Sequence, residues 1–199
     1  MIRLLGRKTS GNVQKVLWFL EELAFEYLRE DYGRQFNNTA DEAYLTLNPN
    51  GKVPTLIDGD IVIWESNSVL RYLANKSGGQ FYSNDAAGRS YIERWMDWQL
   101  SVLDPAFLAI FREMRTPPEQ RGAQFRTNVS ALAQTLTILD QGLSGSAFAA
   151  GQNISIADIA LGPEVHRCLG FGVALPSLPN VHRWHAEVSK RPGFQKHVT

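Results

Sequence analysis

The chain lacks the features that mark several classes of protein. Cysteine occurs once among 199 residues, at Cys168, so no disulfide can form within the chain and a reducing compartment is indicated. No apolar run approaches the roughly 20 residues of a membrane-spanning helix. Residues 1–8 do not have the layout of a signal peptide. We therefore expect a cytoplasmic protein that does not bind a membrane.

An excess of charge is also missing. Lys plus Arg and Asp plus Glu number 20 each, so electrostatics favour neither nucleic acid nor an anionic membrane as a partner. The four histidines have no metal-like spacing with cysteine or carboxylate side chains, and we expect no metal. Cys168 lies in an apolar helical pattern, which is typical of an inert core thiol.

What the first 78 residues do contain is an alternation of strand and helix patterns. The expected elements are a strand at 2–5, a helix at 12–24, a strand at 25–31, a loop at 33–40, a helix at 41–47, strands at 55–57 and 61–64, and a helix at 66–76. The order β-α-β-α-β-β-α predicts an α/β domain of the thioredoxin type. A right-handed crossover would make its first two strands parallel.

After a linker at residues 79–86, the pattern becomes helical, and residues 87–199 are predicted to form an all-α domain. Apolar residues recur at helical spacing in 92–103 and 125–139. Ser155 and Asp158 form a capping box before a further helix, which Pro163 should kink or shorten. Within this domain, only residues 170–175 have a pattern that could also be a strand.

The stretch from residue 50 to 66 combines a strand edge with a helix start. Asp58-Gly59-Asp60 separates two β-rich runs and predicts a hairpin. Val53-Pro54 leads into the first strand of this hairpin. A cis bond before Pro54 would turn the Val53 N–H and C=O outward, free to pair with an extended ligand. Ser66 is a natural N-cap for the following helix, whose N-terminus favours a bound carboxylate. These parts are suited to binding a peptide.

The motif N-G-K-V-P-T-L-I-D-G, followed by W-E-S, resembles the glutathione-binding half of the glutathione transferases, and the chain is similar to bacterial members of the serine type. The resemblance implies a thioredoxin-like domain followed by an all-helical domain, with glutathione as co-substrate. It implies that Val53, before cis Pro54, pairs with the cysteinyl backbone of glutathione. Glu65 and Ser66 would hold the γ-glutamyl end. Lys52 would pair with the glycine carboxylate or, alternatively, be a solvated lysine beside a turn.

The stretch Thr9-Ser10-Gly11-Asn12 lies where thioredoxin-like redox proteins carry C-x-x-C, and it has no cysteine. Disulfide chemistry on the protein is therefore excluded at this junction. Ser10 is the first candidate to donate a hydrogen bond to the sulfur of bound glutathione, and Asn12 is the second. Alternatively, Ser10 only caps the helix. The loop at 33–40 should cover the glycyl end of glutathione. The resemblance assigns this contact to no single residue of the loop, because its register against the family motif is not fixed.

The resemblance also implies an electrophile pocket between the domains, lined by the first long helix of the second domain. Candidate lining residues are Phe107, Phe111, Met114 and Arg115, with Arg112 as an alternative to Arg115. Apolar residues at helical spacing are, however, more often part of the core.

The leading hypothesis is a glutathione transferase that stabilises the thiolate of glutathione for attack on a small hydrophobic electrophile. A glutathione-dependent disulfide or peroxide reductase is the second, and a non-enzymatic binding or interaction protein is the third. We also expect a homodimer, because the family implies one and because Trp95 and Trp98 stand among polar residues, an unusual outer face for a monomer.

Overall fold

The computed structural model describes all residues from 1 to 199 and divides the chain into two compact units. The first comprises Met1–Tyr82 together with Arg191–Thr199, and the second comprises Ser83–Lys190. From the sequence we expect residues 191–199 to belong to the helical domain, whereas in the structure they pack with the first unit. We describe each unit by itself.

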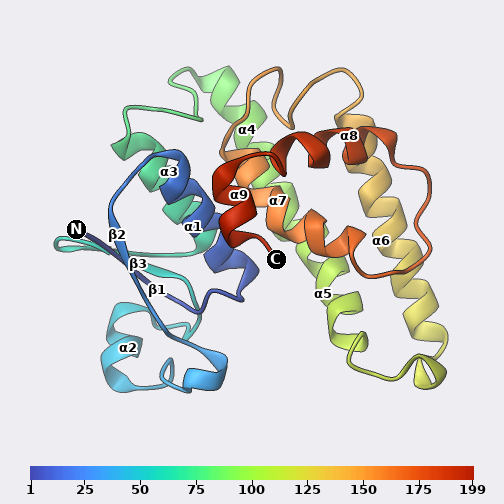
Figure 1. The fold of residues 1–199 in the computed structure, drawn as a ribbon, viewed down its shortest axis with the longest axis horizontal. Coiled ribbons are helices and arrows are strands. Elements are labelled where there is room, and N and C mark those ends of the chain that lie inside the picture. The colour runs from blue at the N-terminus through green and yellow to red at the C-terminus, as the bar shows by residue number, and fades with distance from the viewer. The chain divides into compact units, whose positions relative to one another are not determined.

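The first unit is built on a mixed, 4-stranded sheet with the order β2-β1-β3-β4 (Figure 1). The strands are β1 (Ile2–Leu5), β2 (Tyr27–Glu30), β3 (Thr55–Asp58) and β4 (Ile61–Trp64). β1 pairs with β2 in parallel, which confirms the expected crossover, and β3 pairs antiparallel with both β1 and β4. Leu5 faces Thr55 in this register, so the chain leaving β1 lies beside the chain entering β3.

Three helices follow the strands as the sequence predicts: α1 (Gly11–Glu22), α2 (Glu42–Leu47) and α3 (Ser66–Lys76). The loop predicted at 33–40 contains one short 3-10 helix, η1 (Arg34–Phe36). α1 and α3 contact each other and lie together above the strands in Figure 1, with α2 below. The apolar residues of both helices are buried because they form the core against the sheet. This unit confirms the thioredoxin-like β-α-β-α-β-β-α order.

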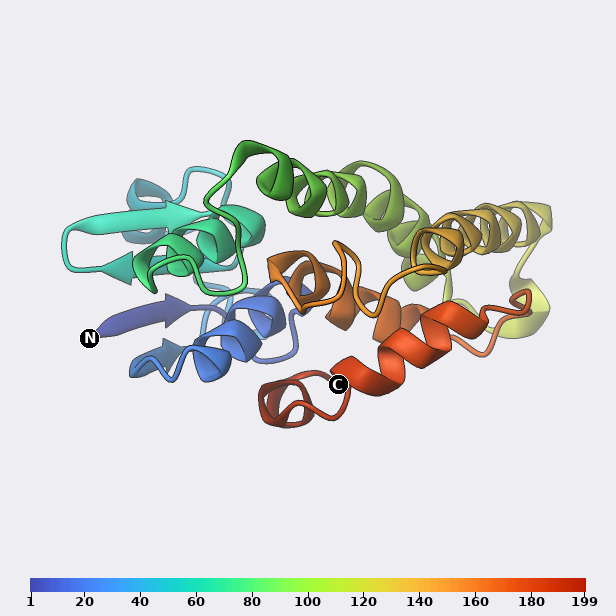
Figure 2. The same cartoon turned by 90° about the horizontal axis from the view of Figure 1, so that it is seen from above.

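A further helix, α9 (Pro192–His197), packs along α1, and Figure 2 shows the two helices side by side. The ring of Phe194 meets the ring of Trp18 edge-on, with centroids 5.1 Å apart. A Cβ at Gly193 would come within 2.7 Å of the Trp18 side chain, so only glycine allows this approach. Arg191 forms an ion pair with Glu22, whose carboxylate also accepts a hydrogen bond from the Trp18 indole. These contacts explain why the last residues belong to the first unit.

The second unit is helical and contains no named strand, as predicted. Its helices are α4 (Ala86–Trp98), the π-helical η2 (Gln99–Leu103), α5 (Asp104–Glu113), η3 (Pro118–Gln120), α6 (Ala123–Gly142), α7 (Ile156–Leu169) and α8 (Pro179–Val188). Residues 170–175, which were ambiguous in the sequence, form neither strand nor helix. α7 continues through Pro163, so this proline does not end the helix. None of the helices in the chain is both long and apolar enough to span a membrane.

Trp95 does not lie on the surface of this unit as the sequence suggests. We expected Trp95 and Trp98 to form an exposed face, but Trp95 is only 8% exposed and its ring meets that of Trp98 edge-on at 5.2 Å. Gly142 on α6 makes room for it, since a Cβ there would lie 2.5 Å from the ring. The side chain of Trp95 is therefore part of the core, and the sequence argument for a dimer loses this support.

Candidate active site

The turn between β1 and α1 presents Ser10 at the N-cap position of α1. Its φ of −85° and ψ of 124° are typical of an N-cap, yet its side chain makes no capping hydrogen bond. The Ser10 N–H donates to the Arg7 carbonyl at 3.2 Å, and the Gln14 N–H donates to the Ser10 carbonyl at 2.8 Å. The backbone of Ser10 is thus fixed, while its hydroxyl has no partner in the chain. The alternative in which Ser10 only caps the helix lacks the bond that it requires.

Val53 and Pro54 form the edge that the sequence predicts for a peptide. The bond between them is cis, as expected. No hydrogen bond within the chain uses the N–H or the C=O of Val53. The Val53 side chain packs at the positions of Gly6 and Gly33, where an added Cβ would lie 3.4 Å from Val53 atoms. This packing places the segment beside the end of β1, which leads into the Ser10 turn.

A buried polar network holds the carbonyl of Lys52, the residue before this edge. The sequence motifs do not predict this network. The Tyr44 hydroxyl and the Asn48 side-chain amide both donate to the Lys52 carbonyl, at 2.5 and 2.8 Å. Both side chains also bond to the Thr55 hydroxyl, at 2.9 and 3.1 Å. Burial raises the pKa of Tyr44, which keeps its phenol neutral. A polar residue directly before a proline, as in Asn48-Pro49, was the available sequence signal.

The Lys52 side chain is exposed, and its ammonium has no ion-pair partner in the chain. This observation fits both sequence interpretations, a solvated lysine and a lysine awaiting a carboxylate. Because the network fixes its carbonyl and leaves its side chain unpaired, Lys52 combines a rigid backbone with an available positive charge.

Glu65 and Ser66 form the corner between β4 and α3. Glu65 has a φ of 67°, an unusual value for a residue with a side chain, and it occupies the N-cap position of α3. The expectation that Ser66 is the N-cap is therefore wrong, since the left-handed turn at Glu65 makes Ser66 the first helical residue. The Ser66 hydroxyl donates instead to the Asn12 side-chain oxygen at 3.3 Å. This bond joins the starts of α1 and α3.

The predicted electrophile residues cluster within the helical unit. Phe107 is buried and stacks on Phe111, with ring centroids 5.3 Å apart. Phe171, which follows α7 and was not predicted, also stacks on Phe107, with ring centroids 5.6 Å apart. The Arg115 guanidinium lies 5.8 Å from the Phe111 ring centroid, and Met114 follows the last residue of α5. The aromatic part of this set is thus partly core, as the alternative interpretation has it.

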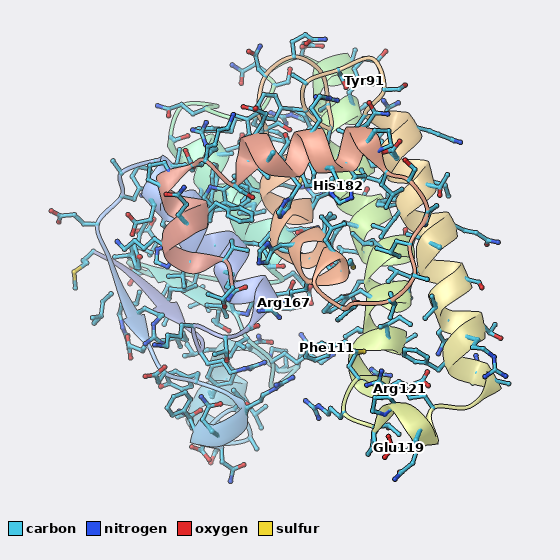
Figure 3. All side chains as sticks on the ribbon, turned by 45° about the vertical axis from the view of Figure 1, so that its right-hand side comes forward. Tyr91, Phe111, Glu119, Arg121, Arg167 and His182 are labelled. Atoms are coloured by element: carbon cyan, nitrogen blue, oxygen red, sulfur yellow. The ribbon has the colours of Figure 1, made fainter.

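A pocket of about 480 Å³ lies elsewhere in the helical unit, and none of these predicted residues lines it. It opens between α6 and the chain after α7, next to the turn that carries Arg121 (Figure 3). Its lining residues include Arg121, Phe125, Val129 and Val173. The electrophile pocket predicted from the sequence therefore stays a prediction.

The histidines and the cysteine do not form a reactive cluster. No group of three or more His, Cys, Asp or Glu side chains is arranged to hold a metal ion. Cys168 is buried, and burial raises the pKa of its thiol well above the usual value. A neutral, inaccessible thiol is inert.

The first unit thus combines a sheet of thioredoxin order, an edge with unpaired main-chain groups and two helix N-termini without a side-chain cap, and it is followed by a helical unit. Comparison with known proteins gives the family. Residues 2–75 match the family model of the glutathione S-transferase N-terminal domain, and residues 102–192 match that of the C-terminal domain. This chain belongs to the glutathione S-transferase family, as the motif resemblance implies.

Individual relatives cover the whole chain. Glutathione S-transferase GstB of Escherichia coli is 36% identical over 100% of this chain and 98% of its own length. The disulfide-bond oxidoreductase YfcG of the same organism is 28% identical over 92% of this chain and 88% of its own. A theta class glutathione S-transferase from Xanthomonas axonopodis pv. citri, solved with glutathione bound, has a TM-score of 0.93 and 34% identity, covering 100% and 97% of the two chains.

Proposed function

We propose that this member of the glutathione S-transferase family binds glutathione along Val53 and transfers its thiolate to an electrophile. The observation that carries the proposal is the set of main-chain groups at Val53 that no part of the chain uses, beside the uncapped starts of α1 and α3. An extended peptide can pair with both groups of Val53, as an added strand does. A relative that was solved with glutathione bound, 34% identical over 100% of this chain, supports this choice of peptide.

The charged ends of glutathione match the groups that flank Val53. The γ-glutamyl ammonium would pair with Glu65, and its carboxylate would meet the Ser66 hydroxyl and the first N–H groups of α3. Those N–H groups have no partner within a helix, and the helix dipole favours an anion there. The glycine carboxylate would pair with the exposed Lys52 ammonium. Each end of the peptide then meets a group of opposite charge.

Ser10 is the group that we propose to stabilise the thiolate. A free thiol has a pKa of about 8.5, and lowering it by two units needs about 2.7 kcal/mol of preference for the charged form. A hydroxyl donor together with N–H groups at the start of α1 can supply this stabilisation. Asn12 is the second candidate, since its side-chain oxygen accepts a bond from Ser66 and its amide N–H groups are still able to donate. Its proposed role is to position Ser66, whose hydroxyl would turn from the Asn12 oxygen to the γ-glutamyl carboxylate when glutathione binds.

The thiolate then attacks an electrophile, which we propose to be a small hydrophobic molecule held by Phe107, Phe111, Met114 and Arg115. Stacked aromatic rings favour a flat, apolar substrate, and the Arg115 cation near Phe111 favours one that develops negative charge. The sulfur forms the new bond, and the leaving group departs with the electron pair of the bond that breaks.

Ser10→Ala tests the catalytic part of this proposal. Turnover at neutral pH should fall about 10- to 100-fold with a small change in glutathione affinity, the pattern of an interaction that acts on the reacting state. Ser90→Ala, at an exposed serine on α4, is the matched control and should behave as wild type. Asn12→Ala should mainly weaken glutathione binding. A raised thiol pKa in Asn12→Ala with an unchanged one in Ser10→Ala would reverse our assignment.

The same preparation separates the alternative activities. We expect conjugation of aryl halides to exceed reduction of mixed disulfides and peroxides, because the one thiol of the chain is buried and cannot exchange. The relative named disulfide-bond oxidoreductase makes the reductase assay necessary. Glutathione binding without turnover of any of these substrates would favour the non-enzymatic alternative.

We also propose a homodimer in the cytoplasm. The proposal of a dimer rests on the resemblance to the family, and two exposed apolar side chains of the helical unit, Tyr91 on α4 at 53% and Ile138 on α6 at 49%, offer positions for testing it. Light scattering at micromolar concentration should give twice the chain mass, and Ile138→Glu should lower it. The lone cysteine fits a reducing compartment, which cell fractionation can test.

A further inference from the structure

Gln14 has a buried side chain that reaches back to the turn before α1. Its side chain is 0% exposed, and its amide nitrogen donates to the Lys8 carbonyl at 3.0 Å and to the Thr199 hydroxyl at 3.1 Å. A side-chain amide has two N–H donors, and these two bonds occupy both. The sequence motifs did not single out this residue.

Gln14 holds the turn at two points. Its main-chain N–H donates to the Ser10 carbonyl at 2.8 Å, while its side chain fixes the Lys8 carbonyl two residues earlier. The Ser10 N–H in turn donates to the Arg7 carbonyl. The direction of the Ser10 hydroxyl therefore depends on a backbone that Gln14 clamps from inside the unit.

The second partner of Gln14 comes from the far end of the chain. Thr199 follows Val198, which is buried, and α9 holds this segment against α1 through the contact between Phe194 and Trp18. The ion pair between Arg191 and Glu22 fixes the start of the same segment. Residues 191–199 thus bring a hydroxyl to the amide that clamps the turn.

We propose that Gln14 is a positioning residue for the thiolate-stabilising group, and that the segment 191–199 supports it through Thr199. Gln14 acts through Ser10 and does not touch glutathione. The inference rests on the proposed function, because it assumes that the Ser10 hydroxyl stabilises the thiolate. Without the clamp, the turn gains freedom and the hydroxyl spends less time directed at the sulfur.

Ultraviolet titration of the glutathione thiolate bound to the full chain measures this effect. Gln14→Leu should raise the apparent pKa of bound glutathione by about 0.5 to 1 unit, the equivalent of one neutral hydrogen bond. Thr199→Val, which keeps the shape but removes the hydroxyl, should give a smaller rise, and Thr199→Ser should restore the wild-type value. In Gln14→Leu and Thr199→Val, kcat at neutral pH should fall while KM for glutathione changes little.

Tyr72→Phe is the matched control, because it removes a hydrogen bond between α3 and the end of β3 in the same unit without touching the turn or the segment 191–199. An equal rise of the thiolate pKa in Tyr72→Phe would overturn the proposal, since general loosening of the unit would then explain the effect. A rise in Ser10→Ala with wild-type values in Gln14→Leu and Thr199→Val would overturn the positioning role alone. An unchanged pKa in Ser10→Ala would remove the proposed role of Ser10 and this inference with it. If Gln14→Leu does not fold, Thr199→Val and Thr199→Ser decide.

Discussion

The N-termini of α7 and α8 in the helical unit differ from those of α1 and α3 in the first unit. At α7 and α8 a carboxylate of the protein is present: Asp158 lies at the start of α7, and Asp140 on α6 accepts the Val181 N–H at the start of α8. In the first unit, α1 and α3 have no capping side-chain bond and no acid in their first turns. A helix start that the protein leaves without an anion is available to one from a ligand.

Asp158 shows how the helical unit supplies a buried carboxylate with hydrogen-bond donors. This fully buried carboxylate accepts the Ala149 and Ser155 N–H groups and the Trp184 indole N–H, each at 2.8 Å. Burial raises its pKa, and these hydrogen bonds oppose that rise. The helical unit uses carboxylates for stability. The first unit keeps Glu65 exposed at its corner, where a ligand can reach it.

Removing the carboxylate from the filled helix start should have the largest effect. Asp158→Ala leaves three buried N–H donors without a partner, so we expect the free energy of unfolding to fall by about 3–5 kcal/mol. Urea denaturation followed by circular dichroism measures it. Asp140→Ala, which frees fewer donors, is the comparison and should lose less. Equal, small losses in both variants would contradict the structural role of these acids.

Removing the acid from the open corner should affect binding instead. Glu65→Ala should weaken glutathione binding by about 1.5–3 kcal/mol, because it removes a charge-assisted contact, and Ser66→Ala should act in the same direction. Calorimetry measures the affinity, and the urea midpoint serves as the control for folding. Unchanged affinity in a folded Glu65→Ala protein would show that this corner does not hold the γ-glutamyl end.

The parts of the site that the sequence predicts are those set by local chemistry. The hairpin after Pro54 follows from residues within a few positions of one another, whereas the cis bond is what the resemblance to the family implies. The parts that it does not predict join distant segments: Gln14 and Thr199 are 185 positions apart, and nothing in either local pattern indicates the contact. The same holds for the attachment of residues 191–199 to α1.

Two wrong expectations have local causes that only the backbone reveals. Ser66 has the side chain of an N-cap, but the positive φ of Glu65 moves the cap by one position. Trp95 has polar neighbours that suggest an outer face, but Gly142 on another helix opens space for its ring. The capping box at Ser155 and Asp158 is confirmed because its whole geometry lies within one turn.

Two serines at helix starts allow a direct test of the comparison. The Ser155 hydroxyl accepts the Ala157 N–H at 3.3 Å, whereas the Ser10 hydroxyl caps nothing. We expect Ser155→Ala to lower the free energy of unfolding by about 1 kcal/mol, a usual cost for an N-cap, and Ser10→Ala to lower it by less than about 0.5 kcal/mol. Urea midpoints of both variants measure the difference. A larger loss in Ser10→Ala would mean that Ser10 has a structural role after all.

The smallest expected effect is a pH dependence of the helical unit. His166 on α7 and His185 on α8 stack with their ring centroids 5.2 Å apart. The Nδ1 atom of His166 lies 3.0 Å from the Nε2 atom of His185. Burial lowers the pKa of both rings below 6.5, and nearby positive charge lowers it further, from Arg167 at His166 and from His166 and then His182 at His185. The unfolded chain therefore takes up protons first as the pH falls.

The stability from this pair should be complete above about pH 6.5 and should decrease as the pH falls below that value. Urea midpoints at pH 7.5, 6.5 and 5.5 measure the decrease, and His166→Asn should reduce its slope because one titrating ring is gone. His182→Gln is the control, since His182 is exposed, and it should keep most of the slope. His197 in the first unit also has a pKa lowered mainly by burial, so His197→Asn is needed to subtract its share. If His166→Asn and wild type lose stability equally between pH 6.5 and 5.5, the pair does not couple the packing of α7 and α8 to protonation.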